Sequence, residues 1–329
     1  MSIRRSISGG QGPARIPPGK DPYRAWFLEH RATLEAEGHI GALKNPSGAA
    51  VELAAELEPF AIHRCLETGF LFANPRITPR GAEAYFSSDA VSAYFPVVEQ
   101  SIAFRVENNY RPVARMLRER LGSGQCLLEV GCGGGGFLEV LRDEGFAVEG
   151  VETAVGAVPY WTRRGLTVHR GLLEEFHPAA PFDIVLMWSV MDHFYDPIDA
   201  LRICHAALRP GGWIFIGNVN TGGFDHHVMG FDCATFSPPG RVNYYGVESL
   251  SVHLGIAGFD VVEVSTPGRL DVDMVRDYWR NGGNNRHHPF LDELVNGDES
   301  AAAAFQRFLS DNKLSGYQTI LARKGDDRV

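Results

Sequence analysis

Apolar and polar residues follow two regular patterns between residues 105 and 265. Short apolar runs predict buried strands, and the segments between them carry apolar residues at the spacing of amphipathic helices. Strands that alternate with helices indicate a mainly parallel sheet covered by helices, so the pattern predicts an α/β fold. Predicted strands cover 146–152, 182–187, 213–219 and 259–264, and two more end just before Gly131 and near Arg170. Predicted helices cover 105–121, 198–208 and 246–257.

The first hundred residues follow a less regular pattern. Residues 1–20 combine Ser, Gly, Pro and a few basic residues without an apolar core, which predicts a disordered leader and not an export signal. Residues 22–37 and Ala49–Leu57 are each predicted to form a helix, and Phe70–Phe72 to form a strand. We therefore expect a separate N-terminal extension over residues 21–104.

The domain expected at 105–329 carries two further features near its C-terminal end. Residues 218–245 are predicted to be a long loop that forms the wall of an acceptor site, since loops of this length are uncommon unless they bind something. Residues 266–315 are predicted to be an insertion, helical from 274 onward. The alternation over 316–323 predicts a last, antiparallel strand at the edge of the sheet.

A glycine-rich turn, Gly131 to Gly136, follows the first predicted strand of this domain. Glycines let the backbone bend sharply and approach a ligand closely, so the turn indicates a cofactor site. The spacing is also that of a dinucleotide-binding turn. Glu152 ends the next strand about 20 residues later, where a carboxylate can bind the hydroxyls of a ribose. Both NAD and S-adenosylmethionine carry that ribose, so Glu152 does not distinguish them.

The order of the later motifs resembles the class I S-adenosylmethionine-dependent methyltransferases. Their E-x-G-x-G-x-G turn matches Glu129, Gly131, Gly133 and Gly135, and a Pro-Gly-Gly turn at 210–212 precedes the fifth strand. The resemblance covers roughly residues 105–265 and identifies the superfamily but no substrate. It implies a Rossmann-like, seven-stranded methyltransferase sheet with helices on both faces, and S-adenosylmethionine as the cofactor.

The resemblance also implies which residues bind the cofactor. The turn would contact the methionyl part and the ribose, and Glu152 would bind the ribose hydroxyls. Two leucines after the third strand would clamp the adenine, and the residues that end the fourth strand would line the methionine side. The expected cofactor-binding residues are Glu129, Gly131, Cys132, Gly133, Gly135, Glu152, Leu172, Leu173, Trp188 and Ser189.

Methyl transfer needs an acceptor atom held close to the methyl carbon, and no covalent nucleophile. His193 follows the fourth strand and is the best candidate base, because an imidazole can take a proton from a hydroxyl or an amine near neutral pH. Asp192 is expected to orient His193 or to share its catalytic role. His226, His227 and Tyr244 in the predicted loop are reserve candidates.

Residues 62–79 resemble the tail of a zinc ribbon that precedes many bacterial methyltransferases of this type. Cys65 stands at the first cysteine of that motif, but Thr68 replaces the second, and His63 and His39 do not complete a tetrahedral site. The segment is therefore expected to be a metal-free remnant. The part of the extension nearest the domain is expected to act as a lid, as it does in related enzymes.

Charge, hydropathy and cysteine content limit the kinds of partner and the cellular setting that the sequence suggests. A formal net charge of -9 argues against nucleic acid as a partner, and no apolar run approaches the roughly 18 residues of a membrane span. The five cysteines form no C-x-x-C pair, which indicates free thiols and a cytoplasmic setting. The sequence does not indicate an oligomeric state.

The favoured function is methyl transfer to a small-molecule acceptor. The front region and the Pro-Gly-x-Leu-Asp-Val-Asp element at 267–273 resemble segments of a subset of bacterial methyltransferases. This resemblance implies a sugar or a secondary metabolite as the acceptor, and oxygen, nitrogen and carbon acceptors stay open. An NAD-dependent oxidoreductase and a non-catalytic binding module with a methyltransferase fold are the alternatives.

Overall fold

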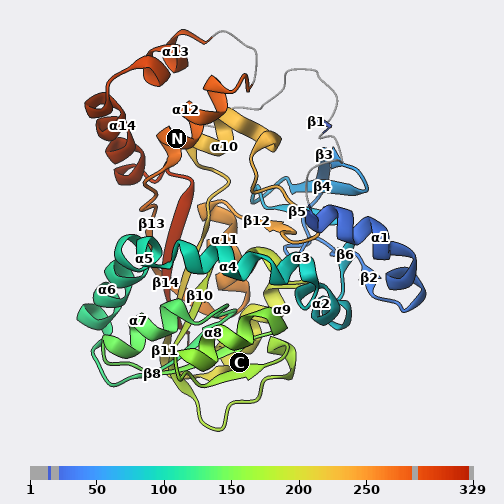
Figure 1. Cartoon of the computed structure of the whole chain (residues 1–329), viewed down its shortest axis with the longest axis vertical. Coiled ribbons are helices and arrows are strands. Elements are labelled where there is room, and N and C mark those ends of the chain that lie inside the picture. Colours follow the sequence, from blue (N-terminus) through green and yellow to red (C-terminus); the bar gives the residue numbers. More distant parts are fainter. Residues whose placement is uncertain (1–13, 16–21, 284–287, 326–329) are drawn as a thin grey trace.

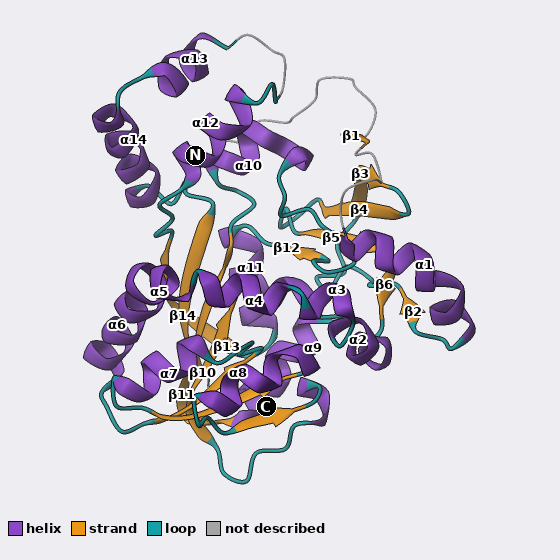
Figure 2. Ribbon diagram, viewed as in Figure 1, coloured by secondary structure: helices purple, strands orange, loops and turns teal. Residues whose placement is uncertain are grey.

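The computed structural model describes residues 14–15, 22–283 and 288–325. Its main element is a seven-stranded sheet in the order β13-β14-β11-β10-β7-β8-β9. The strands are drawn in orange in Figure 2. Each pairing among β11, β10, β7, β8 and β9 is parallel, and β14 runs antiparallel to both of its neighbours. The strands are β7 (Cys126–Val130), β8 (Ala147–Glu152), β9 (Val168–Arg170), β10 (Phe182–Trp188), β11 (Leu208–Val219), β13 (Phe259–Ser265) and β14 (Tyr317–Lys324).

The predicted α/β sheet of seven strands is confirmed, but the position of the last strand was wrong. β14 lies between β11 and β13, so Ile320 is paired with Ile216 on one side and with Val264 on the other. Ile320, Leu321 and Ala322 are all buried, which is the continuous apolar run of an interior strand covered on both faces. The edge of the sheet is formed by β13 instead.

Helices cover both faces of the sheet because neighbouring strand residues point to opposite sides. Leu127 packs in a core with α6 and α7, whereas the next residue, Leu128, packs in a second core with α9 and α11. The helices of the two faces lie on either side of the strands in Figure 1. The bounds are α6 (Arg111–Leu121), α7 (Gly136–Asp143), α8 (Val158–Arg163), α9 (Pro197–Ala207) and α11 (Val247–Ile256).

The N-terminal extension contains helix α1 (Pro22–Ala36) and a second sheet in the order β1-β3-β4-β5-β12. The helix predicted at 49–57 is wrong, because the chain there forms strand β3 and pairs with β4. Ala and Leu are strong helix formers, but helix propensity amounts to less than about 1 kcal/mol per residue, and pairing with a neighbouring strand overrides it. The bounds are β2 (Ile40–Gly41), β3 (Val51–Leu57), β4 (Phe60–Cys65), β5 (Leu71–Asn74) and β6 (Arg76–Ile77).

The predicted leader lies mostly outside the described residues. Ala14–Arg15 is described, and it forms strand β1, which pairs in parallel with β3. The expectation of disorder therefore fails for these two residues.

The N-terminal sheet is completed by a strand from the larger domain. β12 (Asn243–Tyr244) pairs antiparallel with β5, so the segment at 218–245 and the extension share one sheet. Arg76 adds a second link. Its buried guanidinium donates hydrogen bonds to the carbonyls of Ala73, Tyr195 and Val242.

Short helices connect the extension to the main sheet and lead, through a π-helical turn at Val106–Tyr110, into α6. The segment expected to be a helical insertion contains helices in its described residues, and these lie beyond one end of the sheet (Figure 1). The expected loop at 218–245 is partly wrong, because it contains a helix as well as β12. The bounds are α2 (Pro79–Phe86), α3 (Asp89–Ser92), α4 (Tyr94–Gln100), α5 (Ile102–Arg105), α10 (Phe224–Met229), α12 (Asp271–Arg280), α13 (Pro289–Asn296) and α14 (Glu299–Asp311).

Candidate active site

A cavity of about 950 Å³ opens at the carboxyl ends of β7, β8, β10 and β11. In open α/β sheets this is the edge where ligands bind. One wall comes from the glycine turn and the ends of the strands, and the opposite wall comes from the N-terminal extension, residues 232–241 and Met274 of α12. The cavity therefore joins three parts of the chain that are far apart in sequence.

The backbone conformation of the glycine turn disfavours side chains at two positions. Gly131 has a φ of 70° and Gly133 a φ of 53°, which is the left-handed region that favours glycine. A Cβ atom at Gly131 would also clash with the side chain of Val190. Both glycines line the cavity, so the backbone of the turn faces whatever binds there.

Glu152 lines the cavity at the end of β8. Its carboxylate accepts hydrogen bonds from the backbone N–H groups of Gly133 and Ala154, both at 2.8 Å. Burial raises the pKa of this carboxyl, and the two backbone hydrogen bonds act in the opposite direction. The charged group is thus fixed beside the turn, and its remaining lone pairs are available for hydroxyl donors.

Three predicted cofactor residues lie beneath this surface and do not line the cavity. Glu129 is buried, and its Oε2 has no hydrogen-bond partner among the described residues. Burial and the neighbouring Glu152 raise the pKa of Glu129 well above its usual range. Cys132 is buried in close contact with β8, and Gly135 caps α7 against Leu166 and Trp161.

The remaining predicted cofactor residues divide into two groups. Leu172, Leu173 and Ser189 line the cavity, and the Ser189 hydroxyl lies 3.2 Å from the hydroxyl of Tyr317. Trp188 does not line the cavity, which corrects the expectation that its ring faces the cofactor. Its ring packs at 5.3 Å from the ring of Phe137, within the apolar core of the sheet.

His193 lines the cavity in a short turn after β10. Its Nδ1 lies 2.5 Å from the carbonyl oxygen of Gly240, and a carbonyl can only accept, so Nδ1 carries the proton. The other ring nitrogen, Nε2, is then free to accept a proton. Asp192 is buried, 3.7 Å from Nε2 and 3.0 Å from Nε of Arg241. Gly240 holds the imidazole in one orientation, and Asp192 lies where its carboxylate would stabilise the ring once Nε2 is protonated.

The three reserve candidates are placed differently by the structure. His227 is exposed, and Tyr244 is buried with its hydroxyl donating to the carbonyl of Arg241. His226 is buried between Asp225 and Cys233. Cys233 itself lines the cavity. Sequence reasoning missed Arg241 and Cys233, although an Asp-His pair with a cysteine seven residues later was visible in the sequence.

Aromatic side chains form the roof of the cavity. Tyr85 and Phe86 of α2 and Tyr94 and Phe95 of α4 line it, and the Phe95 ring lies above Gly133. Phe236 lines the cavity from the other side of the roof. The segment at 79–100 therefore occupies the place expected for a lid, and it provides flat apolar surface.

The zinc-ribbon-like segment reaches this cavity only at its end, where Ile77 and Pro79 line it, and Cys65, Thr68 and His63 do not. Cys65 is buried, and its Sγ is 3.4 Å from the hydroxyl of Ser47. Thr68 accepts a hydrogen bond from the backbone of Phe70 and so closes the turn between β4 and β5. In the described residues, Cys65 and His63 belong to no group of three metal-binding side chains. The absence of zinc stays a prediction.

Residues 103–264 match the sequence model of a family described as a methyltransferase domain. The matched residues include the glycine turn, Glu152 and His193 and cover the strands that form the cavity edge. Residues 103–264 are a class I S-adenosylmethionine-dependent methyltransferase domain. The site fits S-adenosylmethionine. The backbone of the glycine turn, where a side chain at Gly131 would clash, and the fixed carboxylate of Glu152 line the same cavity.

Two related proteins match part of the methyltransferase domain. A ubiquinone biosynthesis O-methyltransferase of Caulobacter vibrioides is 35% identical over 105 residues, which are 30% of this chain and 42% of that protein. A protein of the same description from Pseudomonas paraeruginosa is 29% identical over 113 residues, or 31% of this chain and 48% of that protein. The chain thus spans about half the length of these relatives.

Solved structures share the fold of the methyltransferase domain. A magnesium protoporphyrin IX methyltransferase from Synechocystis has a TM-score of 0.50 at 11% identity, and the match covers 74% of this chain and 98% of that chain. A methyltransferase from Haloferax volcanii, solved with an activator protein, has a TM-score of 0.50 at 13% identity and covers 71% and 97%. In the described residues, no helix is both long enough and apolar enough to cross a membrane.

Proposed function

We propose that this protein transfers a methyl group from S-adenosylmethionine to a small molecule that contains a flat, largely apolar ring. The observation that carries the proposal is that Glu152, the glycine turn and His193 line one cavity with the aromatic roof. Of the two acceptor classes expected from the sequence, the rings of Phe86 and Phe236 favour a flat secondary metabolite over a sugar.

The residues of the chain divide the work between two sides of the cavity. When bound, the cofactor supplies an electrophilic methyl carbon, and Gly131, Gly133 and Glu152 would hold its ribose and methionyl part. The aromatic roof would exclude water and align the acceptor ring. Nε2 of His193 would take the proton that the acceptor atom loses, and Gly240 would fix the ring for this step.

Two observations bear on the alternatives. A carboxylate at the end of β8 suits NAD as well, so Glu152 alone does not exclude an oxidoreductase. The match to a methyltransferase domain favours S-adenosylmethionine. A non-catalytic module would have no use for a histidine held by Gly240 in the wall of the cavity. The five free cysteines suit the reduced cytoplasmic setting that we propose for the protein.

Titration calorimetry tests the proposal directly. We expect S-adenosylmethionine and S-adenosylhomocysteine to bind with micromolar affinity, on the order of -8 kcal/mol, and NADH to give no heat. Production of S-adenosylhomocysteine is then measured with phenols, flat nitrogen heterocycles and sugars as acceptors. Binding of NADH in place of S-adenosylmethionine, or turnover with sugars alone, would contradict the proposal.

A further inference from the structure

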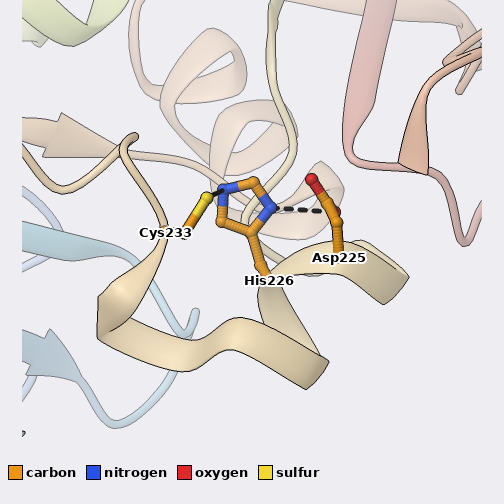
Figure 3. Close-up of side chains that lie close together, drawn as sticks. All are labelled: Asp225, His226 and Cys233. Atoms are coloured by element: carbon orange, nitrogen blue, oxygen red, sulfur yellow. Dashed lines mark hydrogen bonds and ion pairs between the residues drawn. The ribbon is translucent and has the colours of Figure 1, made fainter. Parts of the chain in front are cut away.

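Three side chains near the cavity form a linear array (Figure 3). Nδ1 of His226 lies 3.0 Å from Oδ1 of Asp225, and Nε2 of His226 lies 3.5 Å from Sγ of Cys233. The Thr235 hydroxyl is 3.1 Å from the same Nε2 and 3.5 Å from Sγ. All four side chains are buried, and Cys233 and Thr235 line the cavity.

The array is not arranged as a metal chelate, although the three ligand atoms lie within 4.8 Å of one another. Asp225 and Cys233 face opposite nitrogens of the His226 ring, as Figure 3 shows. An ion bound to Nε2 beside the thiol would have the imidazole between it and the carboxylate. The order carboxylate, imidazole, thiol is instead the order in which a base activates a nucleophile.

We propose that Asp225, His226 and Cys233 form a nucleophilic thiol site in the acceptor wall, which adds covalently to a conjugated carbonyl compound. The inference rests on the proposed function in one respect, that the cavity is where the acceptor binds. The inference narrows the acceptor class to molecules in which a carbon–carbon double bond of the flat ring is conjugated with a carbonyl.

The surroundings of Cys233 favour the thiolate. Burial raises the pKa of its thiol, but hydrogen bonds from His226 and Thr235 outweigh burial and lower it. Burial lowers the pKa of His226, yet the bond to Asp225 and the contact with Cys233 raise it to about 9. Asp232, the residue before Cys233, accepts a hydrogen bond from Tyr278 of α12, and Asp271 accepts one from Ser315. The contact between the two side chains therefore favours the thiolate paired with an imidazolium.

The covalent step balances without an oxidant. The Sγ electron pair of Cys233 forms a bond to the β carbon of the acceptor, and the electrons of the carbon–carbon double bond move to give an enolate. The His226 proton stabilises the enolate oxygen. The α carbon, now electron-rich, would take the methyl group of bound S-adenosylmethionine as its carbon–sulfur bond breaks and S-adenosylhomocysteine leaves. His193 removes the remaining α proton, the double bond reforms, and the thiolate leaves, so that Cys233 is regenerated.

Alkylation with N-ethylmaleimide, a conjugated carbonyl probe, tests the nucleophile without the cofactor. Cys126 is a free and exposed cysteine of the same chain and serves as the internal control. Peptide mapping by mass spectrometry at pH 6 is expected to show Cys233 reacting at least about tenfold faster than Cys126. His226→Gln and Asp225→Asn should remove that advantage while the Cys126 rate stays the same. Equal rates at both cysteines, or an unchanged Cys233 rate in His226→Gln, would overturn the proposal.

A second measurement separates this inference from the proposed function. Calorimetry on the Cys233→Ser variant should give a cofactor affinity within about twofold of the parent, because the cofactor is held by other residues. Methylation of conjugated carbonyl acceptors should fall by at least about 10²-fold. Normal turnover in Cys233→Ser would refute the covalent step and leave the methyltransferase proposal intact. One zinc ion per chain, lost in both Cys233→Ser and His226→Gln, would also refute it in favour of a metal site.

Discussion

The carboxylate of Glu152 accepts a hydrogen bond from the backbone N–H of Gly133 at 2.8 Å. The two residues are 19 positions apart and lie on neighbouring segments at the edge of the sheet. The bond holds the glycine turn in register with the end of β8 before any ligand is present. A site that is rigid in advance loses less entropy on binding.

Replacement of Glu152 by Ala should weaken S-adenosylmethionine binding by roughly 1.5–3 kcal/mol, because charge-assisted hydrogen bonds to the ribose are lost. Calorimetry measures the effect. The ligand-free protein should also unfold at a lower temperature, because the backbone N–H groups of Gly133 and Ala154 lose their acceptor. Glu149→Ala is a matched control, since Glu149 lies on the same strand and pairs with the exposed His169. Equal affinities in the Glu152 variant and the parent would mean that the carboxylate does not contact the cofactor.

With an acceptor identified, His193→Ala should lower kcat by about 10²–10⁴, because no base then accepts the proton that the acceptor loses. Cofactor affinity should stay near that of the parent. His227→Ala provides the control, because His227 is an exposed histidine within residues 218–245. A His193 variant that retains activity within a few-fold of the parent would show that positioning alone is sufficient.

Arg76→Met should destabilise the fold by about 3 kcal/mol or more, because three buried carbonyls lose their charged donor. Chemical denaturation of the ligand-free protein measures the free energy of unfolding. Arg80→Met alters an exposed arginine four residues away and should have little effect. Similar unfolding midpoints for the two variants would show that Arg76 does not tie the extension to the domain.

Acid should destabilise the protein through His253. Burial lowers the pKa of this imidazole to about 4, whereas the unfolded chain titrates near 6.5. The neutral form is favoured in the folded state, so this contribution is fully present above pH 6.5 and is lost as the pH falls toward 4, on the order of 3 kcal/mol. Unfolding of a His253→Gln variant should depend less steeply on pH over that window. His177→Gln, at an exposed histidine, should keep the slope of the parent.

Purified protein should carry no stoichiometric zinc at the front segment, because Thr68 cannot supply a thiolate. Elemental analysis after dialysis against a mild chelator checks this expectation. About one zinc per chain, lost on Cys65→Ser but retained on Cys233→Ser, would show that the zinc-ribbon-like segment still binds metal.

The sequence predicted the strands of the main sheet and the longer helices that cover it, because their signals are local, whereas the short helices α8 and α10 were not predicted. The spacing of apolar residues around 126–152 and the glycine turn depend on short stretches of chain. The order of strands does not. β14 lies between β11 and β13 because Ile320 pairs with residues about 56 and 104 positions away, and no local pattern encodes such partners. The strand at 51–57 was missed for the same reason.

The two sides of the cavity also differed in how far the sequence predicted them. The turn and Glu152 were predictable, because a family motif fixes their spacing. The acceptor side is assembled by tertiary packing, so the roof from α2 and α4 and the thiol of Cys233 meet only in the folded chain. Trp188 shows the opposite error. It ends the correct strand, but the pleat of β10 directs its ring into the core.

The shared sheet, in which β12 pairs with β5, has a consequence for how such a protein diversifies. The residues that would recognise an acceptor are inherited in two pieces, one before and one after the glycine turn, and each contributes strands to the same ladder. A recombination event that exchanged only the first piece would pair the strand Asn243–Tyr244 with a β5 strand of a different sequence. New acceptor preferences should therefore arise by coordinated substitutions on both strands more readily than by shuffling of the N-terminal segment.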